Sequence, residues 1–474
     1  MKRLRRMVLL ALVAACSDSS GPDDALGVPV LLQVNGVTEP NGLVGMTVLL
    51  EGSSLGDSAR GSVYFAAQTG GRVEAPALRA DWTNTFIIAA VPVGVADSSF
   101  VWVETTGGVS DSIPFTLINS GTFSPSNIAW TATTPLPQAL QGLGALALRV
   151  QHGASPASYV YAAGGADANN AAASAVYRAT VQGGGMLGAW DVLGALPEAR
   201  AYHALAVATP STARIDTTNA GYLYVVGGLD ANGEAVNSVY LAEVGLDGAV
   251  SAWQSTTPLP TALHSAGAAI FRGFLYVVGG ADAQHAATTS GFRALVRSDG
   301  TLGTWEPLPA LPAPRAYHAL VSFGPYLYVV GGDGGTVAPE LNSLSGSETN
   351  GAYHARIDVR DGAITEWNPV ANMSKARGKH AAVVAGGSVL ATSGIYSGQV
   401  GSSENTYATI GPTGALAAWN GATGSSTIDA VLGYGVFNAA AVSLIDAQGQ
   451  GHVLVLGGGR RSGGGGVSAA VVYY

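Results

Sequence analysis

Charged residues are scarce in this chain of 474 residues, since Lys, Arg, Asp and Glu together make up only 11% of it. The net charge is −9 at pH 7, and no basic cluster occurs beyond the N-terminal residues. A nucleic-acid partner is therefore excluded, because a phosphate-binding surface needs clustered Lys and Arg. Gly, Ala, Val and Tyr are abundant instead, which is typical of many short, tightly turned strands.

Cysteine is almost absent, because Cys16 is the only one in the chain. An intrachain disulfide and a zinc site with paired cysteines are thereby excluded. The chain also lacks an H-E-x-x-H motif, a G-x-S-x-G elbow followed by a helix, and an acidic loop of the EF-hand kind. We expect neither a metal nor a cofactor, and no catalytic residue can be named.

Long apolar runs are missing as well, and the longest at the N-terminus, Met7–Ala15, is too short to span a bilayer. It follows Lys2, Arg3, Arg5 and Arg6, an arrangement typical of an export signal. The sequence VAAC that ends at Cys16 resembles the lipobox of bacterial lipoproteins. The resemblance implies a signal peptide over residues 1–15, lipidation of Cys16 and a flexible tether over residues 16–27. A plain secretory signal with an incidental cysteine is the alternative.

This resemblance implies that the protein is exported and lipid-anchored in the cell envelope. Ser17 stands where Asp would be the usual inner-membrane retention signal, so the outer membrane or cell surface is the expected location.

Short alternating segments separated by Gly and Pro occupy residues 28–118 and predict a β-sandwich. The expected strands are 30–34, 47–51, 62–65, 86–90 and 100–105. Gly42, Gly45, Gly52, Trp82 and the pair Gly107-Gly108 resemble the pattern of IPT/TIG domains, which are immunoglobulin-like. The resemblance implies a spacer or a binding module, followed by a linker over residues 119–127.

The rest of the chain, residues 128–474, is a repeat. An aromatic-x-Tyr-x-x-Gly-Gly phrase recurs at Tyr159–Gly165, Tyr222–Gly228, Phe274–Gly280 and Tyr326–Gly332, with degenerate copies at Val389–Gly394 and Val453–Gly458. One tryptophan marks each unit, at Trp130, Trp190, Trp253, Trp305, Trp367 and Trp419. These units resemble kelch repeats, whose period is about 50 residues.

The resemblance implies an all-β fold in which a six-bladed kelch-type β-propeller follows the immunoglobulin-like sandwich. The chain ends after three strands of the last unit, while an unassigned strand, Ile128–Trp130, precedes the first. We expect this N-terminal strand to become the outer strand of the sixth blade, because ring closure removes both free strand edges.

Loops between successive blades meet at the central mouth of a kelch propeller, where function usually lies. Three of them read Arg-Ala-Tyr-His, Arg-Ala-Tyr-His and Arg-Gly-Lys-His, while Leu140 and Leu263 occupy the arginine position in two others. Arginine offers a planar fork for carboxylates and tyrosine a stacking surface for sugars or peptides. The predicted ligand-binding residues are Arg200, Tyr202, Arg315, Tyr317, Arg377 and Lys379. The alternative is that the arginines and histidines brace neighbouring blades.

Three functions remain open at this stage. The favoured hypothesis is a surface-displayed module whose mouth binds a glycan or a protein. A carbohydrate-active enzyme, such as a sugar-acid mutarotase or lyase, is the second, although galactose-oxidase chemistry is excluded because it needs a propeller cysteine. A purely architectural envelope protein is the third, since fold alone does not give function.

Overall fold

The computed structural model describes residues 27–34, 41–59, 61–75, 77–117, 128–152, 155–209, 212–213, 218–337, 345–358, 360–396, 404–421, 428–432, 434–446, 450–460 and 470–473. Cys16, the predicted signal peptide, all of the predicted tether except Gly27, and the predicted linker over residues 119–127 lie outside these residues. Within the described part of the chain, no helix is long and apolar enough to cross a membrane.

Two sheets near the N-terminus enclose a common apolar core. One has the strand order β1 (Val30–Val34), β3 (Thr47–Ser53), β7 (Phe86–Ala90) and β6 (Ala77–Trp82). The other has the order β2 (Asn41–Gly42), β10 (Ile113–Leu117), β8 (Ser98–Thr105), β4 (Gly61–Ala66) and β5 (Arg72–Ala75), with β9 (Gly108–Val109) beside β8. Alternate residues of β8 and β10 are buried, as expected when one face of a strand packs on a core. Phe65 and Phe115 meet edge to face in that core, with their ring centroids 5.0 Å apart.

Six four-stranded antiparallel sheets follow among the described residues, and we number them I to VI. Sheet I contains β12 (Gly144–His152), β13 (Ser155–Ala163), β14 (Ala173–Val181) and β15 (Leu187–Arg200); sheet II contains β16 (Ala204–Ala208), β17 (Gly221–Val226), β18 (Val239–Val244) and β19 (Gln254–Thr256). Sheet III contains β20 (Gly267–Phe271), β21 (Phe274–Val278), β22 (Gly291–Leu295) and β23 (Glu306–Pro307); sheet IV contains β24 (Ala319–Phe323), β25 (Tyr326–Val330), β26 (Ala352–Arg356) and β27 (Asn368–Val370).

Sheet V contains β29 (Ala381–Ala385), β30 (Ser388–Thr392), β32 (Thr406–Thr409) and β33 (Asn420–Gly421). Sheet VI contains β34 (Ala440–Ile445), β35 (Gly451–Leu456), β36 (Ala470–Tyr473) and, as its outermost strand, β11 (Trp130–Ala132). The short pair β28 (Arg377–Gly378) and β31 (Ile395–Tyr396), the helix α1 (Ile428–Leu432) and a 3-10 turn at Gly183–Gly185 complete the elements.

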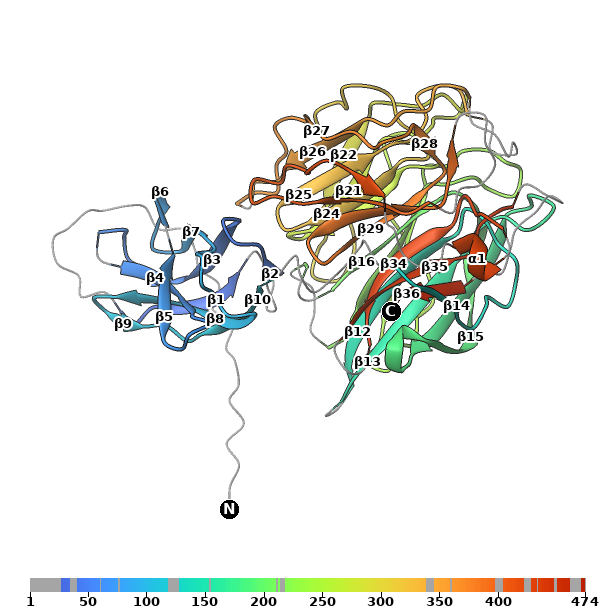
Figure 1. Ribbon diagram of the computed structural model, residues 1–474. Coiled ribbons are helices and arrows are strands. Elements are labelled where there is room, and N and C mark those ends of the chain that lie inside the picture. Colours follow the sequence, from blue (N-terminus) through green and yellow to red (C-terminus); the bar gives the residue numbers. More distant parts are fainter. Residues whose placement is uncertain are drawn as a thin grey trace, which may run out of the picture.

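The first strands of the six sheets lie side by side in a closed cycle: β12 contacts β16, and the contacts continue through β20, β24, β29 and β34 back to β12. The arrangement is propeller-like and stands beside the smaller N-terminal sheets (Figure 1). β11 pairs with β36, so Trp130 lies opposite Tyr473. The strand that precedes sheet I in the sequence is thus the outer strand of sheet VI, as the sequence predicted.

The repeated tyrosine and tryptophan both connect neighbouring sheets. The tyrosine of the second strand donates its hydroxyl proton to a glycine carbonyl of the next sheet, from Tyr161 to Gly248, Tyr224 to Gly300 and Tyr276 to Gly362, at 2.6 to 2.8 Å. The indole N–H of the tryptophan donates in the other direction, to a loop of the preceding sheet, as from Trp305 to the Thr257 carbonyl at 3.0 Å. The repeat phrase therefore encodes adhesion between sheets as well as strand formation.

The double glycine ends the second strand where two sheets come closest. Gly279 has a φ of +62°, and a methyl group there would lie 2.6 Å from the carbonyl oxygen of Arg315. Backbone cannot move away as a flexible side chain can, so only glycine fits this position.

The N-terminal sheets rest on sheets III and IV through an ion pair and apolar contacts, among them Phe271 packed against Leu49 and Ile88. Arg272, in the hairpin between β20 and β21, forms a bidentate pair with Glu51 of β3, with N–O distances of 2.5 and 3.0 Å. Met46 is fully buried in a cluster that includes Phe323 and Tyr326.

Candidate functional site

A ring of six residues surrounds the axis, one from each junction between consecutive sheets: Gly142, Tyr202, Ser265, Tyr317, Lys379 and Asn438. The amide of each donates to the carbonyl of the preceding member at 2.7 to 3.2 Å, and the amide of Gly142 donates to the carbonyl of Asn438. The six hydrogen bonds form an unbroken cycle, which we call the collar.

All six collar residues have a φ between 51° and 58°, the left-handed region that glycine adopts most easily. Holding a larger residue there costs about 1 kcal/mol or more, so five strained positions in one ring point to a constraint beyond local preference. The collar hydrogen bonds compensate for this strain.

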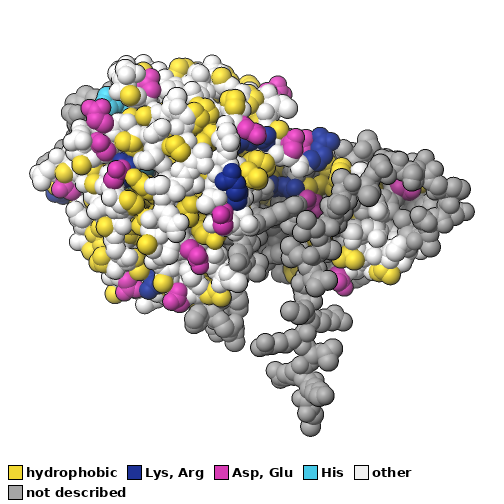
Figure 2. Space-filling view, turned by 180° about the vertical axis from the view of Figure 1, so that it is seen from behind, with side chains coloured by type: hydrophobic (Ala, Val, Ile, Leu, Met, Phe, Trp, Pro, Cys, Tyr) yellow, Lys and Arg dark blue, Asp and Glu magenta, His cyan; other side chains and the backbone are white. Residues whose placement is uncertain are grey.

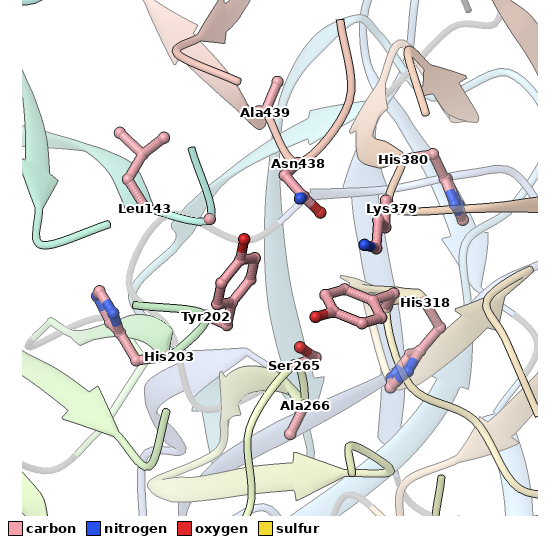
Figure 3. A pocket seen from close by; sticks show the side chains of 12 residues that line it. Leu143, Tyr202, His203, Ser265, Ala266, His318, Lys379, His380, Asn438 and Ala439 are labelled. Atoms are coloured by element: carbon pink, nitrogen blue, oxygen red, sulfur yellow. The ribbon is translucent and has the colours of Figure 1, made fainter. Parts of the chain in front are cut away.

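The collar side chains converge on a small cavity of about 110 Å³. Figure 3 shows Tyr202, Ser265, Lys379 and Asn438 directed toward a common centre, while His203, His318 and His380 lie farther out. A cavity of this size holds several water-sized groups. It is lined by a cation, two phenols, a hydroxyl and an amide, and also by the imidazoles of His203, His318 and His380.

Lys379 and the two tyrosines form the electrostatic centre of the cavity. The Lys379 ammonium lies 4.7 Å from the centroid of the Tyr317 ring, and Tyr317 meets Tyr202 edge to face at 5.7 Å. Burial lowers the pKa of Lys379 to about 8, partly opposed by the Asp333 carboxylate. Burial raises the pKa of both phenols, so both stay protonated and able to donate a hydrogen bond.

Polar neighbours hold two further collar residues. Ser265 Oγ is 3.0 Å from His264 Nδ1, and His264 Nε2 is 3.0 Å from His285 Nδ1. Burial and the neighbouring His285 lower the pKa of His264 to about 3, so His264 is neutral near pH 7. On the opposite side, the Asn438 side chain donates to Gln141 Oε1 at 3.3 Å, and Gln141 in turn donates to Asn170.

The three predicted arginines are buried in the sheet junctions and do not line this cavity. Arg200 has no exposed surface and bonds to Glu198 and Ser238, while Arg377 bonds to Tyr396 and the Glu404 carbonyl. The Arg315 guanidinium lies 5.5 Å from the Tyr353 ring. The backbone carbonyl of each arginine accepts from the second glycine of a repeat phrase, as Arg315 does from Gly280 at 2.7 Å.

His203, His318 and His380 pack beneath the double glycines. A methyl group on Gly164 would lie 2.8 Å from His203 Cε1, and the equivalent contacts recur at Gly279 and Gly331. Burial lowers the pKa of His203 to about 3 and that of His318 to about 4. Of the predicted ligand-binding residues, Tyr202, Tyr317 and Lys379 are therefore brought together at the axis, whereas the arginines are placed in the wall around it.

A larger pocket of about 370 Å³ adjoins the cavity and shares Tyr202 with it. Its wall is formed by the loops after β13 and β17, including Asn169, Asn170, Asp230 and Asn232. The carboxylate of Asp230 closes its own loop by accepting from the amides of Asn232 and Glu234 at 2.8 and 2.9 Å, so its first role is turn formation. Amide side chains lie along the rim, where Asn170 Oδ1 accepts from Gln141 and Asn232 Nδ2 donates to Asp230.

Sequence reasoning did not identify Ser265, Asn438, Asn169 or Asn232. The signal for Ser265 was present, because the register that aligns Leu263 with the arginines places Ser265 on the collar two residues later. Within the described residues, no group of three or more His, Cys, Asp or Glu side chains is arranged to hold a metal ion.

Comparison with known proteins gives one sequence relative of note. Over 155 residues the chain is 27% identical to beta-scruin of Limulus polyphemus, a kelch-repeat protein. The repeats are similar to kelch repeats. The match covers 31% of this chain and 15% of beta-scruin, so the chain spans only a small part of that relative. No protein-family model matches.

A solved structure titled "Structure of YjhT" also matches, with 15% identity and a TM-score of 0.49, over 72% of this chain and 96% of that one. The collar and its cavity lie where the repeats meet.

Proposed function

We propose that the ring is a six-bladed kelch-type β-propeller, that the N-terminal sheets form an IPT/TIG-like domain, and that the collar region binds a glycan. The observation that carries the binding proposal is the collar itself. Its hydrogen-bond cycle fixes Tyr202, Tyr317 and Lys379 around one cavity in a conformation that costs free energy.

The lining of the two connected pockets suits a glycan in particular. The amides of Asn169, Asn170 and Asn232 can donate to and accept from sugar hydroxyls, and Tyr202 offers an aromatic surface between the pockets. The smaller cavity admits a terminal substituent, and Lys379 there attracts an oxygen-rich or anionic one. Figure 2 shows acidic and basic side chains scattered among uncharged ones over the described part of the face that it presents.

The arginines support the site without touching the ligand in this proposal. Arg200, Arg315 and Arg377 are 5% exposed or less, so no ligand reaches them without opening a sheet junction. We assign them the bracing role and place the contacts on the collar.

The same proposal includes export and lipid anchoring through Cys16, with the protein held in the cell envelope at the outer membrane or cell surface. The lipobox-like sequence and the basic, apolar N-terminus support it. The IPT/TIG-like domain then acts as a spacer between the membrane and the propeller.

A glycan array tests the binding proposal, with the full chain purified in detergent. We expect a defined set of glycans to bind, and Lys379→Met and Tyr202→Ala each to weaken binding by about tenfold, equivalent to ~1.4 kcal/mol. Lys375→Met is the matched control, because Lys375 is exposed and paired with Glu404. It should bind as the parent does.

Two outcomes would contradict the proposal. Equal losses for Lys375→Met and Lys379→Met would place the site away from the collar. Binding to no glycan would leave a protein partner or an architectural role as the better explanation.

A further inference from the structure

Lysine is rare in this chain, and one of its lysines is at the axis. The complete sequence contains only Lys2, Lys375 and Lys379. Lys2 lies in the N-terminal segment outside the described residues, and Lys375 is on the surface. Lys379 is 3% exposed and lines the central cavity, so a single amine faces whatever enters it.

Backbone and ring contacts hold Lys379 in place at the collar. Its backbone amide donates to the Tyr317 carbonyl at 3.0 Å, and its ammonium lies over the Tyr317 ring. The Asp333 carboxylate acts on it electrostatically and also accepts hydrogen bonds from the Gly335 amide and from Ser345, which fix the position of this carboxylate.

The remaining groups around the cavity leave this amine as its reactive centre. The neighbouring imidazole of His264 is neutral, and the Tyr202 and Tyr317 phenols stay protonated. Burial lowers the pKa of Lys379 to about 8, so a substantial share of the amine is neutral at pH 7.5. A neutral, desolvated lysine is the form that attacks carbonyl carbon.

We propose that Lys379 is a nucleophilic amine that captures a small aldehyde or ketone, such as the open-chain form of a sugar, as an imine at the centre of the collar. The inference rests on the proposed function, because it assigns a reactive group to the same site.

The chemistry balances without an external oxidant or reductant. Lys379 Nζ attacks the carbonyl carbon, the new C–N bond forms, and the carbonyl π pair moves to oxygen to give a carbinolamine. The two protons that leave the nitrogen end on that oxygen, which departs as water and leaves the C=N bond. The protonated phenols of Tyr202 and Tyr317 are the nearby hydrogen-bond donors for the oxygen.

Reductive trapping tests the proposal on the full chain, with glycolaldehyde as a probe that fits the cavity. Cyanoborohydride converts the imine to a stable secondary amine, and peptide mass spectrometry measures labelling at Lys375 and Lys379 separately. At pH 7.5 we expect Lys379 to be labelled at least about tenfold faster than Lys375, because an ordinary lysine with a pKa near 10.4 is almost fully protonated there. The Lys379 rate should rise through pH 8 and then level off.

A variant and a larger probe distinguish a reactive amine at Lys379 from a cation that has only a structural role. Lys379→Arg keeps a cation in the collar and should abolish fast labelling while the melting temperature changes little. Pyridoxal is bulkier than glycolaldehyde, so its preference for Lys379 over Lys375 should be smaller.

Faster labelling of Lys375, or labelling of Lys379 only after denaturation, would overturn the proposal and make Lys379 a structural cation. Because trapping needs no natural ligand, its result is independent of the glycan array. Trapping at Lys379 without glycan binding would support the amine site and contradict only the glycan proposal.

Discussion

At the scale of single residues, the ring depends on groups that must stay neutral. His203 is buried against Gly164, and neither of its ring nitrogens has a hydrogen-bond partner within the described residues. Charging an imidazole in such a place costs free energy because nothing compensates the lost hydration. His380 lies in an equivalent place, and burial lowers its pKa well below the ordinary value.

Stability should therefore fall with acidification in a specific window. An unfolded histidine binds its proton near pH 6.5, whereas folded His203 resists protonation down to about pH 3. The stabilising contribution is complete above pH 6.5 and is lost as the pH falls below it, with a slope of about 1.4 kcal/mol per pH unit for each such histidine. Urea unfolding between pH 7 and 5 measures this slope.

His203→Phe fills the same space without a titrating group. We expect the free energy of unfolding at pH 7 to change little. Between pH 7 and 5, the slope of that free energy against pH should fall by ~1.4 kcal/mol per pH unit, which is the contribution of one histidine. An unchanged slope would mean that His203 is accessible to protons in the folded state.

At the scale of strands and sheets, ring closure depends on one short strand. β11 supplies the outer edge of sheet VI, and Trp130 is only 3% exposed within a cluster that contains Leu390 of sheet V and Val453 of sheet VI. The same residue thus completes one sheet and joins it to its neighbour.

Trp130→Ala should cost about 3–5 kcal/mol of unfolding free energy, as expected for a large aromatic side chain removed from a core. Trp102→Ala is the comparison, because Trp102 is half-buried in the N-terminal sheets, stacked on Tyr64. Thermal unfolding followed by near-ultraviolet circular dichroism checks both. Deleting residues 128–137 should destabilise the ring further, and an unchanged melting curve would refute closure by β11.

At the scale of the whole molecule, the N-terminal sheets are fixed to the ring instead of merely preceding it. The Glu51–Arg272 pair is mostly buried, with 17% and 8% of the two side chains exposed, and Met46 is fully buried in an apolar cluster that includes Phe323. The N-terminal sheets and the ring are therefore held against each other. In the proposed arrangement, the flexible tether is the part that lets both turn relative to the membrane.

Lipidation of Cys16 can be tested directly. Cells that express the full chain and are fed a clickable fatty acid should yield a labelled protein, and Cys16→Ser should abolish the label. Since Cys16 is the only cysteine, no other thiol can take its place. Persistent labelling of the variant would refute the lipobox interpretation. If the unmodified protein is not labelled, a plain secretory signal becomes the better explanation.

The sequence by itself determined the strand pattern, the repeat and the pairing that closes the ring. The alternation in residues 28–118 predicted β1 and β7 with the bounds that the structure has, and the unassigned strand at Trp130 predicted the pairing with β36. These features follow from local periodicity and from counting strands, both of which are written along the chain.

Only the tertiary structure decided which residues line the axis. Arg200, Tyr202 and His203 are neighbours in the sequence, yet the left-handed backbone at Tyr202 sends its side chain to the cavity while the other two enter the sheet junctions. The collar also joins residues about 60 positions apart through backbone hydrogen bonds. Such bonds do not depend on residue type, so the sequence shows no pattern that predicts them. Side-chain type indicated which residues could bind a ligand, and backbone geometry determined which of them reach it.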